Sequence, residues 1–393
     1  MIIEEYIKYL AEVLKCAVTC QQPSDMPPGI DEEKFIKFSS FHKVDNIVYM
    51  VIGDRLSQEN RLRLESSYNR SIMIQATQQY YLERVESAFE DNGIDYLVLK
   101  GRELARLYPS EDMRQSSDFD IYIGRENAHK GKELMLELGF NIEAYSDTDD
   151  DHDEYIIDNF VMCELHRVLI QDNYLWQEEC NKIPERLIPC EGTKHCYKMS
   201  YEDFYVYNLA HAAKHMKFSG VGIRVFLDQW LISKRLGDKI DWSKTEETLK
   251  RADLLDFDRH ARELYEYWFE DKEPSNPQLI KKMELYVAAS GWVGTYNQHT
   301  ATELAEQAGK TNSKAVAKLR KFIEIICEPY EFMLGRYPIL KTHRWMLPLC
   351  RIHRLFRAIL FRRNVVKMVS NELDNADMDE GKRILNFKQT IGL

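Results

Sequence analysis

The chain has 393 residues, of which 44% are hydrophobic and 30% are charged. This length exceeds one ordinary domain and allows two or three subdomains around a sizeable core. The 64 acidic and 53 basic residues give a formal net charge of −11 at pH 7. Such an acidic balance argues against non-specific binding of long nucleic acid over the whole surface, although a local basic patch can coexist with it.

The N-terminal segment, MIIEEYIKYLAEVLKC, is acidic and amphipathic. It lacks the basic region and continuous apolar stretch of a secretory signal peptide, so we expect a cytoplasmic protein. No run of residues approaches the ~18 apolar residues of a membrane span, so we also expect no transmembrane segment.

The cysteines form no CxxC pair and no paired metal spacing, which favours reduced, buried or incidental thiols over a zinc site. The eight cysteines are Cys16, Cys20, Cys163, Cys180, Cys190, Cys196, Cys327 and Cys350.

Helical patterns dominate residues 1–90, with a Pro-rich break, QPSDMPPG, at residues 22–29. The long polar run that begins at Ser57 predicts one or two helices that end at Gly93. We therefore expect a helical N-terminal region over residues 1–90, followed by a core domain over residues 91–200.

The core domain opens with a strand, a turn and a helix. Tyr96–Leu99 predicts the strand, and Lys100 with Gly101 predicts the turn that opens a helix over Glu103–Tyr108. Glycine lets the backbone approach a ligand closely, and the first turn of a helix offers free N–H groups to phosphate oxygens. Lys100 adds a positive charge at this candidate phosphate site.

The next apolar run carries Asp118 and Asp120 at alternating positions. On a strand, both carboxylates then share one face, and Phe119, Ile121 and Ile123 share the opposite, buried face. Carboxylates held this close raise one another's pKa unless a cation lies between them. Mg²⁺ favours carboxylate oxygens together with substrate phosphates, so the pair suits a Mg-nucleotide, with Mn²⁺ as a substitute ion.

Two residues just before this strand are further candidates for nucleotide binding. Arg114 lies four residues before Asp118, and its planar guanidinium group can hold two phosphate oxygens at once. Ser117 directly precedes Asp118 and is assigned to the same nucleotide-binding set.

A third carboxylate lies in the apolar run Phe160–His166. Strand alternation places Met162, Glu164 and His166 on one face of a neighbouring strand. A carboxylate in an apolar strand is costly to bury unless it has a cation partner. Glu164 is therefore predicted as a third metal ligand or as a general base.

An acidic run, SDTDDDHDE, covers residues 146–154. It has neither the spacing nor the glycine of an EF-hand, which favours a solvated loop between two strands over a calcium site. We expect the core strands to end near Ile170, with an irregular segment through Ser200.

These elements resemble the DNA polymerase β-like nucleotidyltransferase superfamily and, more narrowly, a bacterial family of uncharacterised nucleotidyltransferases. The resemblance implies an α+β fold, with a small mixed sheet embedded in a largely helical protein. It also implies Mg²⁺-dependent transfer of a nucleoside monophosphate from a nucleoside triphosphate (NTP). The residues that carry it are Leu99-Lys100-Gly101, Arg114 with Asp118 and Asp120, and Glu164 with His166.

The chain departs from the wider superfamily at two places. Lys100-Gly101-Arg102 stands where a Gly-Ser or Gly-Gly pair is usual, and Asp118 follows Gly101 by seventeen positions, which is longer than the commonest spacing. The narrower family shares the first departure.

Residues 201–393 are predicted to be largely helical. His211 and His215 lie four residues apart on one helix face, as do Arg224 and Asp228. The residue-level interpretations are a packing or surface pair for the histidines and a structural ion pair for Arg224 and Asp228. The family resemblance implies instead that all four, together with His166, line the active cleft.

Residues 341–367 carry eight Lys or Arg and no Asp or Glu. A basic amphipathic helix can dock on the acidic body of its own protein, or bind an anionic membrane surface or nucleic acid. We favour docking on the protein itself.

The combined prediction is a Mg²⁺-dependent nucleotidyltransferase in which Asp118, Asp120 and Glu164 are the catalytic and metal-binding residues. Lys100, Gly101, Arg114 and Ser117 would bind the nucleotide. The acceptor is a hydroxyl or phosphate, with a small molecule or a protein slightly preferred. The alternative is a catalytically silent nucleotide sensor or interaction protein on the same fold, and a purely helical scaffold is the least favoured interpretation because it leaves the buried carboxylates unexplained.

Overall fold

A computed structural model covers the chain and describes residues 2–144, 152–158, 160–171, 174–291, 330, 333, 337–361 and 378–393. The chain divides into two compact units. The first comprises Met1–Gly294 with Gly392–Leu393, and the second comprises Thr295–Ile391. The three-part division over residues 1–90, 91–200 and 201–393 remains a prediction.

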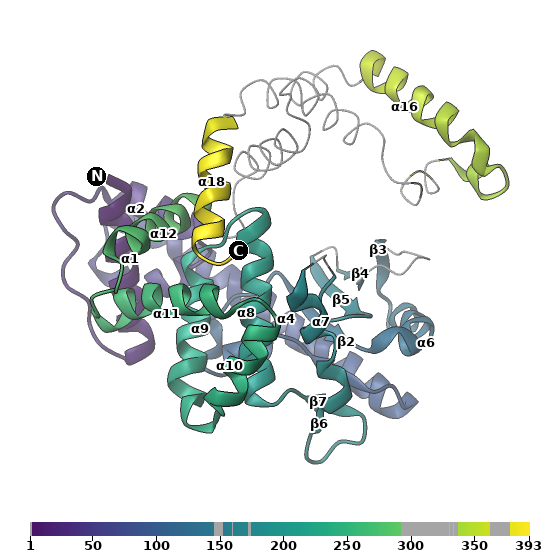
Figure 1. Ribbon diagram of the computed structural model, residues 1–393, viewed down its shortest axis with the longest axis horizontal. Helices are drawn as coiled ribbons and strands as arrows, with labels where there is room; N and C mark the ends of the chain where they lie inside the picture. Colours follow the sequence, from purple (N-terminus) through teal and green to yellow (C-terminus); the bar gives the residue numbers. More distant parts are fainter. Residues whose placement is uncertain are drawn as a thin grey trace. The chain divides into compact units, whose positions relative to one another are not determined.

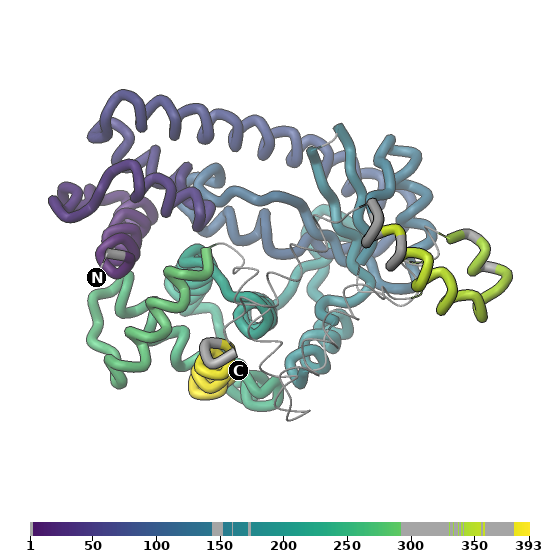
Figure 2. The backbone as a smooth tube through the Cα atoms, turned by 90° about the horizontal axis from the view of Figure 1, so that it is seen from above, coloured from purple at the N-terminus to yellow at the C-terminus, as the bar shows by residue number. Residues whose placement is uncertain are grey.

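Four helices precede the sheet, at α1 (Ile2–Thr19), α2 (Glu32–Phe41), α3 (Asp45–Ile52) and α4 (Gln58–Asn92). The long polar run forms the single helix α4, which ends at Gly93 in a left-handed conformation with φ 67°. Glycine adopts positive φ without steric cost, so it ends the helix here as the sequence predicts. Figure 2 shows α4 running from the N-terminal helices to the strands.

The sheet confirms the α+β class, because it has seven strands in the mixed order β3-β4-β5-β2-β1-β7-β6 (Figure 1). Strands β2 and β5 are parallel, as are β1 and β7, and the other neighbours are antiparallel. The strands are β1 (Tyr96–Val98), β2 (Asp118–Tyr122), β3 (Asn141–Ala144), β4 (His152–Ile157), β5 (Val161–His166), β6 (Ile188–Pro189) and β7 (Cys196–Lys198).

One face of this sheet forms the hydrophobic core with α4 and with α6 (Gly124–Glu137). Ile121 on β2, Tyr155 on β4 and Cys163 on β5 are fully buried there, against Val85 and Phe89 of α4. Since side chains alternate across a strand, the residues between these apolar positions must point to the other face of the sheet.

Three expectations about this region are wrong in detail. His152–Glu154 form the start of β4 rather than a loop, because their backbone pairs with β5; residues 146–151 lie outside the described residues. The helix after the turn is shorter than expected: α5 spans Gly101–Ala105, and the Leu107 and Tyr108 amides then bond to carbonyls three residues back.

The third concerns the segment expected to be irregular after Ile170. It contributes the short helix α7 (Leu175–Cys180) and the strands β6 and β7, which extend the sheet beyond β1.

Five helices complete the first unit: α8 (Tyr201–Phe218), α9 (Ile223–Leu236), α10 (Trp242–Arg251), α11 (Leu255–Glu270) and α12 (Pro277–Ser290). The Ser200 side chain accepts a hydrogen bond from the Asp203 amide and caps the start of α8. The cap fixes the start of α8, which follows shortly after the end of β7.

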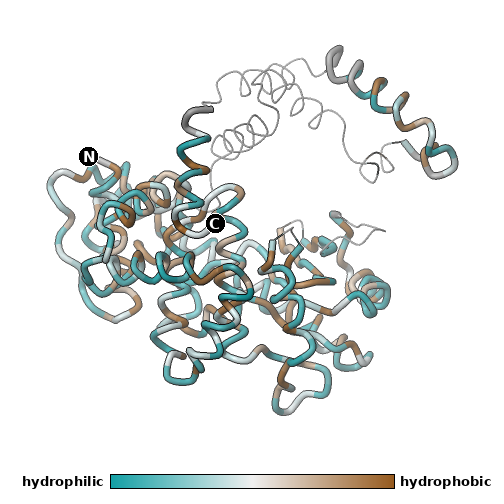
Figure 3. The backbone as a smooth tube through the Cα atoms, in the orientation of Figure 1, coloured by the Kyte–Doolittle hydropathy of each residue, from teal (hydrophilic) through white to brown (hydrophobic). Residues whose placement is uncertain are grey.

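The second unit contains α16 (Leu347–Phe361) and α18 (Met378–Thr390). Hydrophobic and hydrophilic stretches alternate along α16 (Figure 3), as the basic amphipathic pattern of residues 341–367 predicts. Residues 362–367 lie outside the described residues, and the docking of this segment remains a prediction. Among the helices that the structure describes, none is long and apolar enough to cross a bilayer.

Candidate active site

The polar face of the sheet gathers carboxylates from neighbouring strands. Asp120 on β2 lies directly opposite Glu164 on the parallel strand β5, and Asp118 lies opposite Met162. The alternation predicted for both strands therefore places the carboxylates of Asp118, Asp120 and Glu164 on one face. Two separate parts of the sequence meet here because β2 and β5 are adjacent in the sheet.

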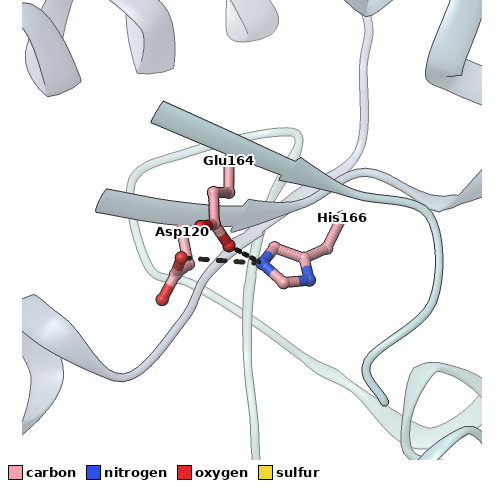
Figure 4. A group of neighbouring side chains, drawn as sticks. All are labelled: Asp120, Glu164 and His166. Atoms are coloured by element: carbon pink, nitrogen blue, oxygen red, sulfur yellow. Dashed lines mark ion pairs between the residues drawn. The ribbon is translucent and has the colours of Figure 1, made fainter. Parts of the chain in front are cut away.

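His166 lies between two of these carboxylates (Figure 4). Its Nε2 atom is 3.5 Å from Asp120 Oδ1 and 3.2 Å from Glu164 Oε2. Burial disfavours the charged imidazole, but the nearby carboxylates of Asp120 and Glu164 outweigh burial, so the pKa of His166 is raised. Asp120, Glu164 and His166 each offer a ligand atom within 4.8 Å of the others.

Asp118 lies beside this group without belonging to it. Among the described residues, the three-membered ligand group around Asp120 comprises Asp120, Glu164 and His166, and Asp118 is the next carboxylate on the same face of β2. Burial, together with the charges of Asp120 and Glu164, raises the pKa of Asp118. The protein therefore holds an ionised Asp118 at an electrostatic cost that a bound cation would relieve.

Lys100 follows β1 and contacts Asp120. Its Nζ atom is 3.8 Å from Asp120 Oδ2, and its side chain is only 14% exposed. Burial lowers the pKa of Lys100, with Asp120 as the largest opposing influence. The Lys100 backbone has φ 24°, a conformation that residues other than glycine rarely adopt, so the chain stores strain at this position.

Arg114 has a protein partner in the structure, and its binding of phosphate stays a prediction. Its Nε atom donates to Asp228 Oδ1 at 2.9 Å, and its Nη2 atom donates to Asp228 Oδ2 at 3.1 Å. The Tyr108 hydroxyl also donates to Asp228, at 2.7 Å. Asp228 on α9 thus forms a bidentate ion pair with Arg114. The four-residue spacing of Arg224 and Asp228 had not predicted this partner. Arg224 donates to the Gln115 carbonyl at 2.7 Å.

His211 and His215 on α8 contact each other, with their Nε2 atoms 3.2 Å apart. Burial is the main cause that lowers the pKa of both imidazoles, and the Lys100 charge adds to it; the pKa of His215 falls to about 4. At neutral pH the pair is therefore uncharged, with one ring donating to the other.

One cavity of about 370 Å³ brings the predicted residues together. The sheet carboxylates form one wall, and α8 and α9 supply the other, which includes Lys214 and Arg224. All twelve predicted site residues line it: Lys100, Gly101, Arg114, Ser117, Asp118, Asp120, Glu164, His166, His211, His215, Arg224 and Asp228.

Sequence reasoning missed four residues around this cavity. His152 and Lys214 line it, and Ser116 donates to Asp118 Oδ1 at 3.4 Å. Glu154 lies next to Glu164 in the β4–β5 pair. No periodic signal marked His152 and Glu154, because residues 152–157 read HDEYII, three polar residues followed by three apolar ones.

A family model for uncharacterised nucleotidyltransferases matches residues 28–270, which include the whole sheet and the cavity. No curated protein and no solved structure gives a significant match to the chain. Because the family match extends over more than half of the sequence, the chain belongs to the uncharacterised nucleotidyltransferase family.

Proposed function

We propose that the protein transfers a nucleoside monophosphate from an NTP to a hydroxyl or phosphate acceptor with the help of Mg²⁺. The observation that carries this proposal is the charge arrangement of the 370 Å³ cavity, where a wall of carboxylates faces a wall with Lys214 and Arg224. A metal-bound triphosphate is complementary to both walls, since the ion binds carboxylates and the phosphate oxygens bind cations.

The residues present fit a divalent ion. Asp118, Asp120 and Glu164 supply the oxygen ligands that Mg²⁺ prefers, and burial, together with the charges of Asp120 and Glu164, raises the pKa of Asp118. These three residues would hold the ion. Once bound, it would neutralise charge on the phosphates and on the leaving pyrophosphate.

The remaining steps belong to the chain's own side chains. Lys214 and Arg224, from α8 and α9, would hold phosphate oxygens together with Lys100, which lies beside Asp120. The acceptor oxygen would attack the α-phosphorus, the bond to the bridging oxygen would break, and pyrophosphate would leave. Where Glu164 and His166 do not bind the ion, Glu164 would instead receive the acceptor proton, with His166 at 3.2 Å to orient the carboxylate or relay that proton.

The acceptor is proposed to be a small molecule or a protein. The net charge of −11 opposes the approach of long nucleic acid, which is also negative. An NTP and Mg²⁺ are abundant in the cytoplasm, where we propose that the protein acts.

The test is calorimetric titration of the four NTPs, with and without Mg²⁺, into the wild type and the Asp118→Asn/Asp120→Asn double variant. We expect Mg²⁺-dependent binding of at least one NTP by the wild type and none by the variant. Exposed Glu137 on α6 provides the matched control, because Glu137→Gln removes one carboxylate far from the cavity lining and should bind as the wild type does.

The ligand identified in this way would then be supplied with an α-phosphate label. Release of labelled product or pyrophosphate would establish turnover, and Mg²⁺-dependent binding without turnover would favour the silent sensor. Equal binding by the wild type and the double variant would contradict the assignment of the site.

A further inference from the structure

The polar face of the sheet extends past β5 onto β4, and the register there is informative. Glu154 pairs with Glu164, and His152 pairs with His166. Since Asp120 also pairs with Glu164, three carboxylates form one row across β2, β5 and β4. The imidazoles of His166 and His152 lie in the next row along the strands.

The imidazole nitrogens of both histidines lie close to carboxylate oxygens of the neighbouring row. His152 Nε2 is 3.5 Å from Glu154 Oε1 and 3.8 Å from Glu164 Oε2. The same oxygen, Glu164 Oε2, is 3.2 Å from His166 Nε2. The two imidazole rings stack with centroids 5.1 Å apart. Glu164 therefore stands between two imidazoles, with one further carboxylate on each side.

The result is two similar ligand sets that share Glu164. One is Asp120, Glu164 and His166, and the other is His152, Glu154 and Glu164; the ligand atoms within each set lie within 4.8 Å of one another. Each set thus offers one imidazole nitrogen, one carboxylate of its own and the shared carboxylate. A carboxylate that bridges two ions about 3.5–4 Å apart is a recurrent feature of two-metal sites.

The donor atoms also select the class of ion. Mg²⁺ binds oxygen ligands and keeps several waters, whereas a mixture of imidazole and carboxylate suits first-row transition metals such as Mn²⁺, Co²⁺ and Zn²⁺. The side chains of His152, Glu154 and Glu164 are 24%, 32% and 22% exposed, so an ion can reach them from solvent.

We propose that His152, Glu154 and Glu164 form a second cation site, for a first-row transition metal, and that Glu164 bridges it to the site at Asp120 and His166. His152 and Glu154 lie outside the residues proposed to bind and transfer the nucleotide. The second site therefore does not require that nucleotide transfer occurs. The competing explanation is an ion pair in which a protonated His152 neutralises both glutamates without a metal.

The experiment is a Mn²⁺ titration of the full chain without nucleotide, followed by electron paramagnetic resonance and calorimetry. We expect two Mn²⁺ ions per wild-type chain, and one ion for His152→Gln and for Glu154→Gln. Glu164→Gln should weaken both sites, because it removes the shared ligand. Pulsed measurements should detect nitrogen coupling from two imidazoles in the wild type and from one in His152→Gln.

Two controls keep the result interpretable. Circular dichroism and thermal unfolding would show that each variant is folded, and Glu137→Gln should retain two ions. Asp118→Asn separates this inference from the proposed function, because it should impair NTP binding while leaving the His152 site intact. Binding of a single Mn²⁺ by the wild type, with no change in His152→Gln, would establish the ion pair and overturn the second site.

Discussion

The two faces of the sheet differ in what their side chains do, although the same strands build both. On β2, Ile121 is fully buried beneath α4 and α6, while its neighbour Asp120 faces the cavity beneath α8 and α9. The apolar face gains free energy by burial. The polar face holds several carboxylates together, and burial with the charges of Asp120 and Glu164 raises the pKa of Asp118, so that an ionised Asp118 is unfavourable there without a cation. Stability and chemistry are thus separated by alternate residues of one strand.

The largest expected effect on stability comes from breaking the ion pair between Arg114 and Asp228. Asp228→Asn removes the charge that Arg114 Nε and Nη2 contact at 2.9 and 3.1 Å, and it leaves a buried guanidinium without its counter-charge. Breaking one partner of a buried pair costs about 3–5 kcal/mol. Chemical denaturation should show this loss of stability. The control is Asp238→Asn, which changes an exposed aspartate just after α9 and should cost almost no stability.

Asp120→Asn should affect turnover far more than stability. We expect nucleotidyl transfer to fall by about 10²–10³-fold, since the ion that would stabilise the developing charge loses a ligand. The free energy of unfolding should fall modestly, because burial is outweighed by Lys100 and His166, which hold the pKa of Asp120 below its ordinary value, so the folded chain stabilises this charge. Steady-state kinetics and denaturation on the same samples check both parts. A large loss of stability would mean that Asp120 is chiefly structural.

Ile121→Val tests the opposite face of the same strand. It removes one buried methylene and should cost about 0.5–1.5 kcal/mol of stability. Turnover per folded molecule should not change, because Ile121 contacts the core and not the cavity. An activity loss beyond the unfolded fraction would show that the two faces are coupled.

The smallest effect concerns pH. Burial, Asp120 and Glu164 raise the pKa of Asp118, so ionisation destabilises the folded chain as the pH rises through that pKa. Without metal, Asp118→Asn should therefore melt about 2–4 °C above the wild type at pH 8 and near the wild type at pH 4. Scanning calorimetry in the presence of a chelator checks this difference. A constant difference at both pH values would contradict the raised pKa.

The apparent affinity for divalent ions should follow the same ionisation. Protons compete with the ion for Asp118, so the affinity of the wild type should fall as the pH drops through the raised pKa. Asp118→Asn should lose most of this dependence. Mg²⁺ titrations at several pH values would measure it.

Local patterns predicted much of the fold and the composition of the site. The alternation around Asp118 and Glu164 indicated two strands with a shared polar face, and the structure pairs β2 with β5 in that way. Gly93 marked the end of α4 because its left-handed conformation is a local property of glycine. Each of these predictions depends on residues close together in sequence.

Predictions failed where distant segments had to meet. The sequence predicted that His152 and Glu154 belong to a polar loop. They form a strand because their backbone pairs with β5, which places Glu154 beside Glu164. The prediction that Arg114 binds phosphate was incomplete, because only the position of α9 brings Asp228 within hydrogen-bonding distance of it. Neither contact leaves a periodic signal, because each joins residues from separate elements.

The sequence by itself determined which side chains share a face, since the two-residue period of a strand is imposed by backbone geometry. It also carried the motif that places the chain among the uncharacterised nucleotidyltransferases. Only the tertiary structure decided which faces meet, which partner Arg114 takes and that Glu164 stands between two imidazoles. Those outcomes depend on strand register and helix packing, which are settled by the burial of the opposite, apolar face.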